Sequence, residues 1–241
     1  MSRTKKREGS KNPATKFISL SGVSGNFGYW NKQLEKTVEL EYPIRFIVLD
    51  VLSTIKGYHS GKQSGIYSNE IHNQSVEILK VKVFGSGDIA TGLYADIKDK
   101  VKGVGGKFTN SVYAMMIVDD EPELINFQFY GASLSPFIDF QKEANIYKNS
   151  VIISDVEPAK KGATSYFIPM FEAGAITDEE GKAADLLDID LQKYFDEYKL
   201  GQLDSSKVEE VADDNKSEWN PTEDDIPPDE IDNSGTPFEE D

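Results

Sequence analysis

The residues best suited to chemistry in this sequence are aromatic and basic side chains that lie in glycine-rich or alternating segments. Aromatic rings give unpaired nucleobases a flat surface to stack on, and lysines neutralise the phosphates of the same strand. Such a set would hold a single nucleic-acid strand without reading its sequence. The candidate residues are Phe27, Tyr29, Trp30, Lys32, Tyr58, His59, Lys62, Tyr67, Lys80, Lys82, Lys107 and Tyr113.

The alternative for each of these rings is a place in the hydrophobic core, where most aromatic residues of strands are found. Phe127 and Phe129 fit this alternative best, because they alternate within a strand-like segment. Tyr29, Trp30 and Tyr58 lie in polar, loop-like surroundings, which favours exposure. We therefore expect these three aromatic residues to reach a ligand more readily than the strand aromatics.

Motifs for catalysis are weak in this chain. It has no cysteine and only two histidines, His59 and His72, which excludes thiolate zinc sites and cysteine nucleophiles. Residues 85–90 imitate the glycine-rich dinucleotide fingerprint, but a short hairpin joins the next two predicted strands and no second βαβ unit follows. We therefore expect neither an enzyme nor a cofactor.

Four carboxylates stand close together at Asp119, Asp120, Glu121 and Glu123. They could hold Mg²⁺ in a nuclease, since carboxylate oxygens are its usual protein ligands. Adjacent acids between two strands are more typical of a solvated turn, and no second acidic cluster with a lysine accompanies them. The sequence therefore predicts no metal site.

The two ends of the chain carry opposite charges. Residues 1–16 hold six Lys and Arg against one Glu, whereas residues 201–241 hold fifteen Asp and Glu against two Lys. The tail thus supplies most of the net charge of −16. Neither end has enough apolar residues to offset the entropy of ordering, so we expect both to be disordered. A basic arm also suits phosphate binding by counterion release.

The acidic tail is not uniformly polar, because aromatic and aliphatic residues stand beside its prolines. A purely solubilising tail has no use for exposed rings. The tail suits either a basic, hydrophobic pocket on another protein or, as a mimic of nucleic acid, the protein's own basic groove. The residues expected to bind a partner are Trp219, Asp224, Asp225, Ile226, Pro227, Pro237 and Phe238.

Hydrophobic periodicity predicts a mainly β domain with accessory helices, of the α+β class. Alternation indicates strands, and apolar residues spaced by three or four indicate helices. The predicted strands are 17–20, 37–56, 66–71, 75–84, 108–118, 124–129, 151–156 and 164–171, and the predicted helices are 88–104, 131–147 and 178–200. Residues 17–131 match the OB-fold, a five-stranded barrel, with helix 88–104 between its third and fourth strands. An open α+β sheet is the alternative.

These patterns divide the chain into four parts. They are a basic disordered arm at 1–16, an OB-like nucleic-acid-binding domain at 17–175, an acidic amphipathic helix at 176–200 and an acidic disordered tail at 201–241. No apolar run approaches the roughly 18 residues of a membrane helix, and no signal-peptide pattern begins the chain. We therefore expect a cytoplasmic protein that does not contact a membrane.

The segment from Val81 to Tyr113 resembles single-stranded DNA-binding proteins of bacteriophages. The similarity lies in the runs Val-Phe-Gly-Ser-Gly, Gly-Leu-Tyr-Ala-Asp-Ile-Lys-Asp-Lys and Gly-Gly-Lys-Phe-Thr, together with the acidic tail. In bacterial members that tail ends in Asp-Asp-x-Pro-Phe. Here residues 224–227 match the body of this tip and residues 237–238 its end, but three further acids follow Phe238.

The resemblance implies a non-enzymatic protein that coats and protects single-stranded DNA during replication, recombination or repair in the host-cell cytoplasm. Its partners would be the DNA and the replication or recombination proteins recruited by the tail. The altered tip suits a phage-encoded partner better than a host protein, and the chain could form a homo-oligomer. Two other functions stay open: an adaptor or structural protein that binds no DNA, and a recombination protein that anneals strands.

Overall fold

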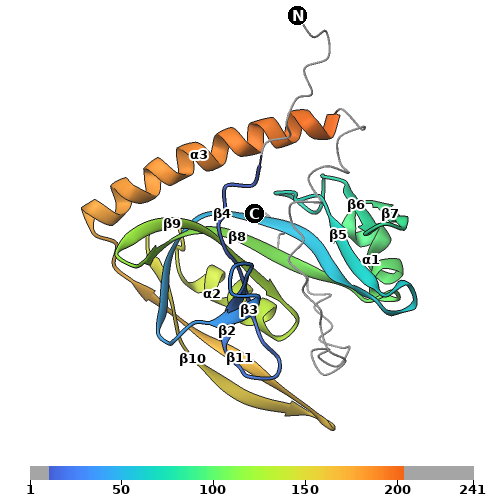
Figure 1. Cartoon of the computed structure of the whole chain (residues 1–241), viewed down its shortest axis with the longest axis horizontal. Coiled ribbons are helices and arrows are strands. Elements are labelled where there is room, and N and C mark those ends of the chain that lie inside the picture. The colour runs from blue at the N-terminus through green and yellow to red at the C-terminus, as the bar shows by residue number, and fades with distance from the viewer. Residues whose placement is uncertain (1–10, 204–241) are drawn as a thin grey trace, which may run out of the picture.

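Two long antiparallel strands form the centre of the computed structural model, which describes residues 11–203. β4 (Ile44–His59) pairs with β8 (Gly106–Val118), and β8 turns tightly into β9 (Glu121–Tyr130). These segments are rich in β-branched and aromatic residues, which favour extended and half-buried backbone. Figure 1 shows β4 and β8 running side by side through the middle of the molecule.

Shorter strands extend the sheet on both sides of this centre. They are β1 (Phe17–Leu20), β2 (Phe27–Asn31), β3 (Lys36–Glu39), β5 (Ser64–Ser68), β6 (Leu79–Val83) and β7 (Gly87–Gly92). The order is β3–β2–β1–β9–β8–β4–β5–β6–β7, and among these described strands only the pair of β1 with β9 is parallel. The sheet is therefore mixed.

A separate hairpin joins the beginning of β4. β10 (Ser150–Lys161) pairs with β4 from Ile44 to Phe46 and with β11 (Thr164–Gly174) along its whole length. Within the described residues β11 pairs only with β10, so the sheet does not close on itself. In Figure 1 this hairpin projects from the bottom of the molecule.

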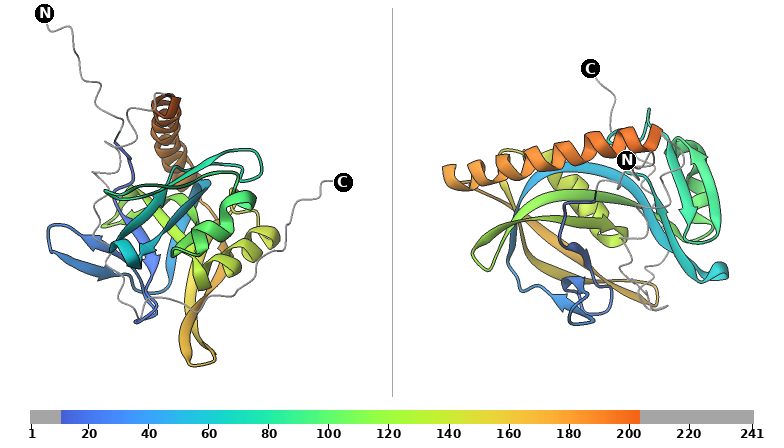
Figure 2. Two further views of the ribbon diagram at one scale, coloured as in Figure 1. Left: turned by 90° about the vertical axis from the view of Figure 1, so that its right-hand side faces the viewer. Right: turned by 45° about the horizontal axis from the view of Figure 1, so that its top comes forward.

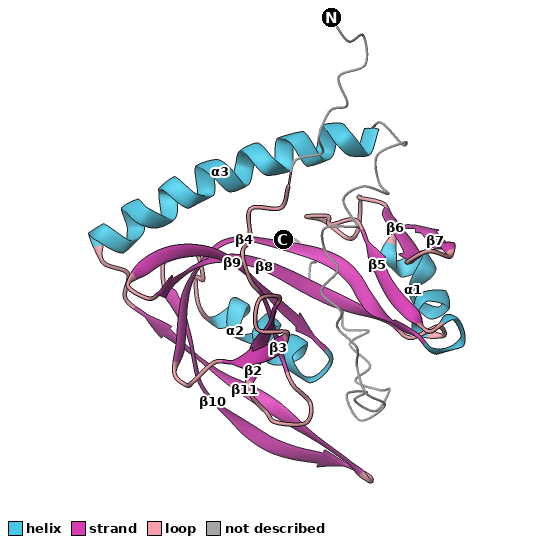
Figure 3. Ribbon diagram, in the orientation of Figure 1, coloured by secondary structure: helices cyan, strands magenta, loops and turns pink. Residues whose placement is uncertain are grey.

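Within residues 11–203, three α-helices accompany the strands, and Figure 3 distinguishes helices from strands by colour. They are α1 (Tyr94–Lys102), α2 (Leu134–Glu143) and α3 (Asp178–Leu203), and two single-turn 3-10 helices, η1 (Ser60–Lys62) and η2 (Gly131–Ser133), lie between strands. The mainly β character with accessory helices is confirmed. None of the helices within residues 11–203 is long and apolar enough to cross a membrane.

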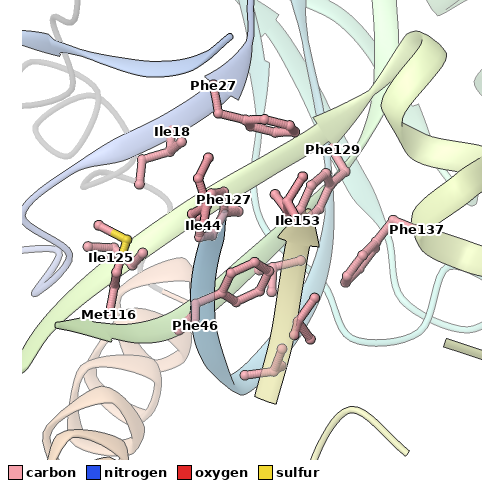
Figure 4. Close-up of a cluster of buried hydrophobic side chains, with 14 of the residues drawn as sticks. Ile18, Phe27, Ile44, Phe46, Met116, Ile125, Phe127, Phe129, Phe137 and Ile153 are labelled. Carbon is pink, nitrogen blue, oxygen red and sulfur yellow. The ribbon is translucent and has the colours of Figure 1, made fainter. Parts of the chain in front are cut away.

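The main core lies between β1, β2, the first half of β4, β8, β9, β10 and α2. Phenylalanines dominate it: the ring of Phe129 stacks on Phe137 of α2 with centroids 4.2 Å apart, and Phe27 meets Phe129 edge-on at 6.0 Å. All three are fully buried, and Figure 4 shows them converging with Ile153 from β10. Burying side chains of this size stabilises the fold by about 1.5–3 kcal/mol each.

A second core fastens α1 to the other end of the sheet. Ile97 and Val101 of α1 pack on Ile55, Ile66 and other apolar residues of β4 to β7. The helix is short because Gly103 follows its last turn and Gly105 has a φ of +93°, which favours glycine. The left view of Figure 2 shows α1 beside this group of strands.

The predicted helix at 88–104 is therefore only partly correct. Its first residues form β7, because Gly85 and Gly87 have φ values of +68° and +85° and turn the chain back along β6. The helix itself belongs to an insertion between the paired strands β4 and β8. Residues 17–131 consequently do not form a five-stranded barrel with this helix between its third and fourth strands.

The end of the predicted basic arm is held against the domain. The amide of Asn12 donates to the hydroxyl of Tyr113 at 2.8 Å, and Lys16 pairs with Glu123. Ala14 is buried in a cluster with Leu191 of α3. Disorder was expected through Lys16, so the ordered domain begins several residues earlier than the sequence predicts.

Candidate nucleic-acid interface

Four side chains on adjacent strands line up in one row across the sheet. Three of them were expected nucleic-acid contacts, and the fourth, Lys56, was not. Lys107 of β8 lies opposite Lys56 of β4, Lys56 opposite Tyr67 of β5, and Tyr67 opposite Lys82 of β6. Directly opposite residues in antiparallel strands point to the same side of the sheet. These four residues, which we call the basic row, therefore form a continuous line of three cations and one ring.

The basic row lies on the face of the sheet that α1 does not cover. The residues that pack against α1, such as Ile55, Ile66 and Val81, are one position out of step with the row and so point the opposite way. Tyr58 and Lys80 are two positions from row members and share their face. Tyr58, Lys80 and all four members of the row are partly exposed.

α3 covers an earlier part of the same face. Its residues Leu191 and Phe195 pack on Leu52 and Tyr113, and Ala184 packs on the residues nearer the start of β4. Leu52 and Lys56 are four residues apart along β4 and therefore point to the same face of the sheet. The helix α3 and the basic row thus occupy consecutive parts of that face. We call it the α3 face.

The lysines of the basic row differ in their surroundings. Burial lowers the pKa of Lys56, and the nearby Glu70 carboxylate opposes this by favouring the charged form. The Lys56 ammonium lies 5.4 Å from the ring centroid of Phe17, a cation–π distance. Lys82 pairs with Asp88 at 3.5 Å, but that carboxylate is 68% exposed, so the pair is weak in water.

Glu70 anchors a polar network on the same face of the sheet as the row. Its carboxylate accepts hydrogen bonds from the hydroxyls of Ser111 and Tyr113, the latter at 2.8 Å. The Ser111 hydroxyl in turn accepts one from the amide of Asn126 at 2.8 Å. These contacts fix the chain after β5 against β8, and so hold β5 and its Tyr67 in position.

The end of β4 and the loop after it hold two further expected residues, His59 and Lys62. Lys62 is exposed in η1, and its ammonium donates to the carbonyl of Ser86 in the neighbouring β6–β7 turn at 3.4 Å. His59 is one position out of step with Tyr58, so it lies on the other face of β4. The structure therefore brings Lys62 toward this region but turns His59 away from it.

Tyr29, Trp30 and Lys32 lie elsewhere on the sheet. They belong to β2 and the turn after it, and β1, β9 and β8 separate β2 from β4. Trp30 is 37% exposed, whereas Tyr29 packs partly against the main core with the Lys16 ammonium 5.6 Å from its ring centroid. This group forms a second aromatic and basic surface rather than part of the row.

Two of the expected contacts are wrong. Phe27 and Tyr113 are both fully buried, Phe27 in the main core and Tyr113 beneath α3. Neither ring can stack on a ligand. Phe127 and Phe129, for which the core was the better expectation, are also fully buried. The remaining residues stay predictions as nucleic-acid contacts.

Sequence reasoning missed Lys56, which the register places between Lys107 and Tyr67. A signal for it exists: Lys56 and Tyr58 alternate with Ile55 and Gly57 at the end of the long apolar strand. That alternation marks one face of the strand as polar.

The acidic cluster forms the turn between β8 and β9. Asp119 and Asp120 are exposed and adopt positive φ values of +51° and +65°, as a tight hairpin turn requires. Among residues 11–203, no three His, Asp or Glu side chains gather closely enough to hold a metal ion. The expected partner-binding residues of the tail, from Trp219 to Phe238, lie outside the described residues.

Comparison of the chain with protein-family models, with curated proteins and with solved structures found no significant match.

Proposed function

We propose that this protein is a non-enzymatic single-stranded DNA-binding protein whose DNA lies along the basic row. Three lysines and a tyrosine in register supply the two elements such binding needs, cations for phosphates and a ring for a base. The row crosses four strands, which is about 14 Å at the usual spacing between strands. That length suits two or three nucleotides.

The strand order supports this placement. Strands β9, β8, β4, β10 and β11 are neighbours in that order, and α2 lies between β9 and β10 in the chain. This is the order of an OB-fold in which β4 is the first strand and α2, rather than α1, is the helix between the third and fourth. We therefore propose a modified, open OB-like arrangement.

An OB-fold binds oligonucleotides on its second and third strands, beside the loops that follow its first and fourth strands. In the proposed arrangement the second strand is β8, which carries Lys107, and the loop after the first strand is the insertion that carries Tyr67 and Lys82. The basic row therefore lies where such a fold would bind a strand.

The resemblance to phage proteins gives the proposed biological role. The protein would coat and protect single-stranded DNA during phage replication, recombination or repair, and its acidic tail would recruit partner proteins. The basic N-terminal segment and the acidic C-terminal segment support these two roles, DNA binding and partner recruitment. No observation favours an enzyme or an adaptor over this role.

A fluorescence-anisotropy titration with oligo-dT tests the proposal. The full-length protein should bind, and affinity should fall steeply with salt. The double variant Lys80→Ala/Lys82→Ala should bind more weakly at low salt and show a salt slope reduced by roughly 1.4, since each single-strand phosphate contact contributes about 0.7.

The matched control is Lys98→Ala/Lys102→Ala, which removes two lysines of α1 beneath the opposite face of the same sheet. Its affinity and salt slope should equal those of the unchanged protein. An absence of binding at low salt, with or without residues 204–241, would contradict the proposal and favour an adaptor. Annealing of complementary oligonucleotides would instead favour a recombination protein.

A further inference from the structure

Beside the basic row lies a second cross-strand line of different composition. Tyr58 of β4 lies opposite Gly65 of β5. The same β5–β6 register carries Gly65 opposite Phe84, whose amide donates to the Gly65 carbonyl at 3.0 Å. A tyrosine and a phenylalanine thus flank a glycine on three adjacent strands.

All three residues belong to the α3 face. Phe84 continues the alternation of Lys80 and Lys82, which are partly exposed, against Val81 and Val83, which are buried beneath α1. Phe84 is 42% exposed, so part of its ring reaches the surface of the domain.

Gly65 leaves open space above its own backbone, on the strand between those of Tyr58 and Phe84. A Cβ atom built on Gly65 meets no atom within 4 Å, and its φ lies outside the left-handed region. Neither backbone conformation nor crowding therefore requires glycine there. A side chain at this position would stand between Tyr58 and Phe84, and its absence leaves a gap.

The gap has the width of one stacked base. Strands lie about 4.8 Å apart, so Tyr58 and Phe84 rise from backbones about 9.6 Å apart. A ring stacked between two others at centroid distances near 4.5 Å needs about 9 Å. Lys82 stands two residues before Phe84 in the chain, and Lys62 reaches the carbonyl of Ser86 two residues after Phe84, so we expect both to serve the flanking phosphates.

We infer that Tyr58 and Phe84 form a slot over Gly65 that takes one unpaired nucleobase between their rings. This site rests on the proposed function and adds Phe84 and Gly65 to it. Stacking recognises the flat face common to all bases, so the slot would accept any of them.

Gly65→Val gives the most direct test, because valine favours strands and its side chain would fill the slot while the fold stays the same. Oligo-dT affinity should fall by roughly 5- to 100-fold, the range for one lost base–aromatic contact, at an unchanged salt slope. Circular dichroism and urea unfolding should match those of the unchanged protein.

Substitutions of Phe84 provide the second arm. Phe84→Leu keeps an apolar side chain but removes the ring and should weaken binding as Gly65→Val does, whereas Phe84→Tyr should bind normally. An oligo-dT carrying one 2-aminopurine should lose fluorescence on binding the unchanged protein, and lose less on binding Phe84→Leu. Tyr147→Ala removes an exposed aromatic residue outside the slot and should change nothing.

Two outcomes separate the slot from the proposed function. If the unchanged protein binds oligo-dT and both Gly65→Val and Phe84→Leu bind equally well, the slot is wrong and the function stands. If the unchanged protein does not bind oligo-dT at all, both are wrong.

Discussion

At the scale of single residues, the hydroxyl of Tyr113 has a structural role in place of the expected contact with DNA. It donates to the Glu70 carboxylate and accepts from the Asn12 amide, both at 2.8 Å. Burial, reinforced by the negative charge of Glu70, raises the pKa of Tyr113 well above its ordinary value, so the hydroxyl remains a donor. It therefore links the N-terminal segment, β8 and the chain after β5.

Removing this hydroxyl tests whether Tyr113 serves the stability of the fold or the binding of DNA. Tyr113→Phe leaves the Asn12 amide and one Glu70 oxygen without that partner, and should lower the free energy of unfolding by about 1–3 kcal/mol in urea titrations. Oligo-dT affinity of the folded variant should not change.

Tyr147→Phe is the control, since that ring is 58% exposed and the variant should unfold like the unchanged protein. A Tyr113→Phe protein with normal stability and weakened DNA binding would restore Tyr113 to the interface and contradict its structural role.

At the scale of elements, the start of α3 is fixed by one carboxylate with several partners. Glu180 pairs with Arg45 of β4 and accepts hydrogen bonds from the backbone and hydroxyl of Thr177, while its own amide donates to that hydroxyl at 3.2 Å. This is a capping box, which satisfies amides at the helix start. The pair with Arg45 attaches the capped end to the sheet.

These contacts predict a pH-dependent attachment. Chiefly the hydrogen bond from Arg45, and then those from Thr177, lower the pKa of Glu180 from 4.5 to about 2. A carboxyl whose pKa is lower in the folded protein stabilises it fully above the unfolded pKa, and this is lost as pH falls from about 4.5 to 2.

Glu180→Gln should therefore lower the free energy of unfolding at pH 7 by less than about 1 kcal/mol, the usual worth of a solvent-accessible pair. The difference from the unchanged protein should shrink steadily below pH 4.5, as followed by urea titration at several pH values. Asp185→Gln, in an exposed part of the same helix, is the control. A difference that stays constant down to pH 2 would show that charge is not its cause.

At the scale of the whole molecule, charge is divided between a cationic row and an acidic terminal segment. Residues 204–241 carry all fifteen acids of the tail and begin just after α3 ends at Leu203. If the domain binds DNA as proposed, a polyanion tethered to it should compete with DNA for the same lysines, most strongly at low ionic strength.

Deletion of residues 204–241 should raise oligo-dT affinity at 50 mM salt, with a smaller gain at 300 mM, in the same anisotropy titration. The full chain carrying Trp219→Ala and Phe238→Ala keeps every charge of the tail and serves as the comparison. It should bind DNA like the unchanged protein. Equal affinity of the truncated and full-length proteins at low salt would exclude competition by the tail.

Local patterns in the sequence determined several elements correctly. The alternation of Lys80 and Lys82 with Val81 and Val83 predicted both a strand and its polar face, since side chains of a strand alternate whatever lies beside it. The acidic helix from Asp178 was also readable, because its apolar residues recur at helical spacing. The separation of charge between the two ends depends on composition alone.

Only the tertiary structure decided which aromatic residues are accessible and which cations are neighbours. Phe27 and Trp30 stand three residues apart in the same glycine-rich segment, yet one is fully buried and the other 37% exposed. Burial depends on what packs against a side chain, and for Phe27 that is β9, about a hundred residues later. Lys56 and Lys107 likewise meet only because strand register joins distant segments, and register is a property of the folded sheet rather than of either strand.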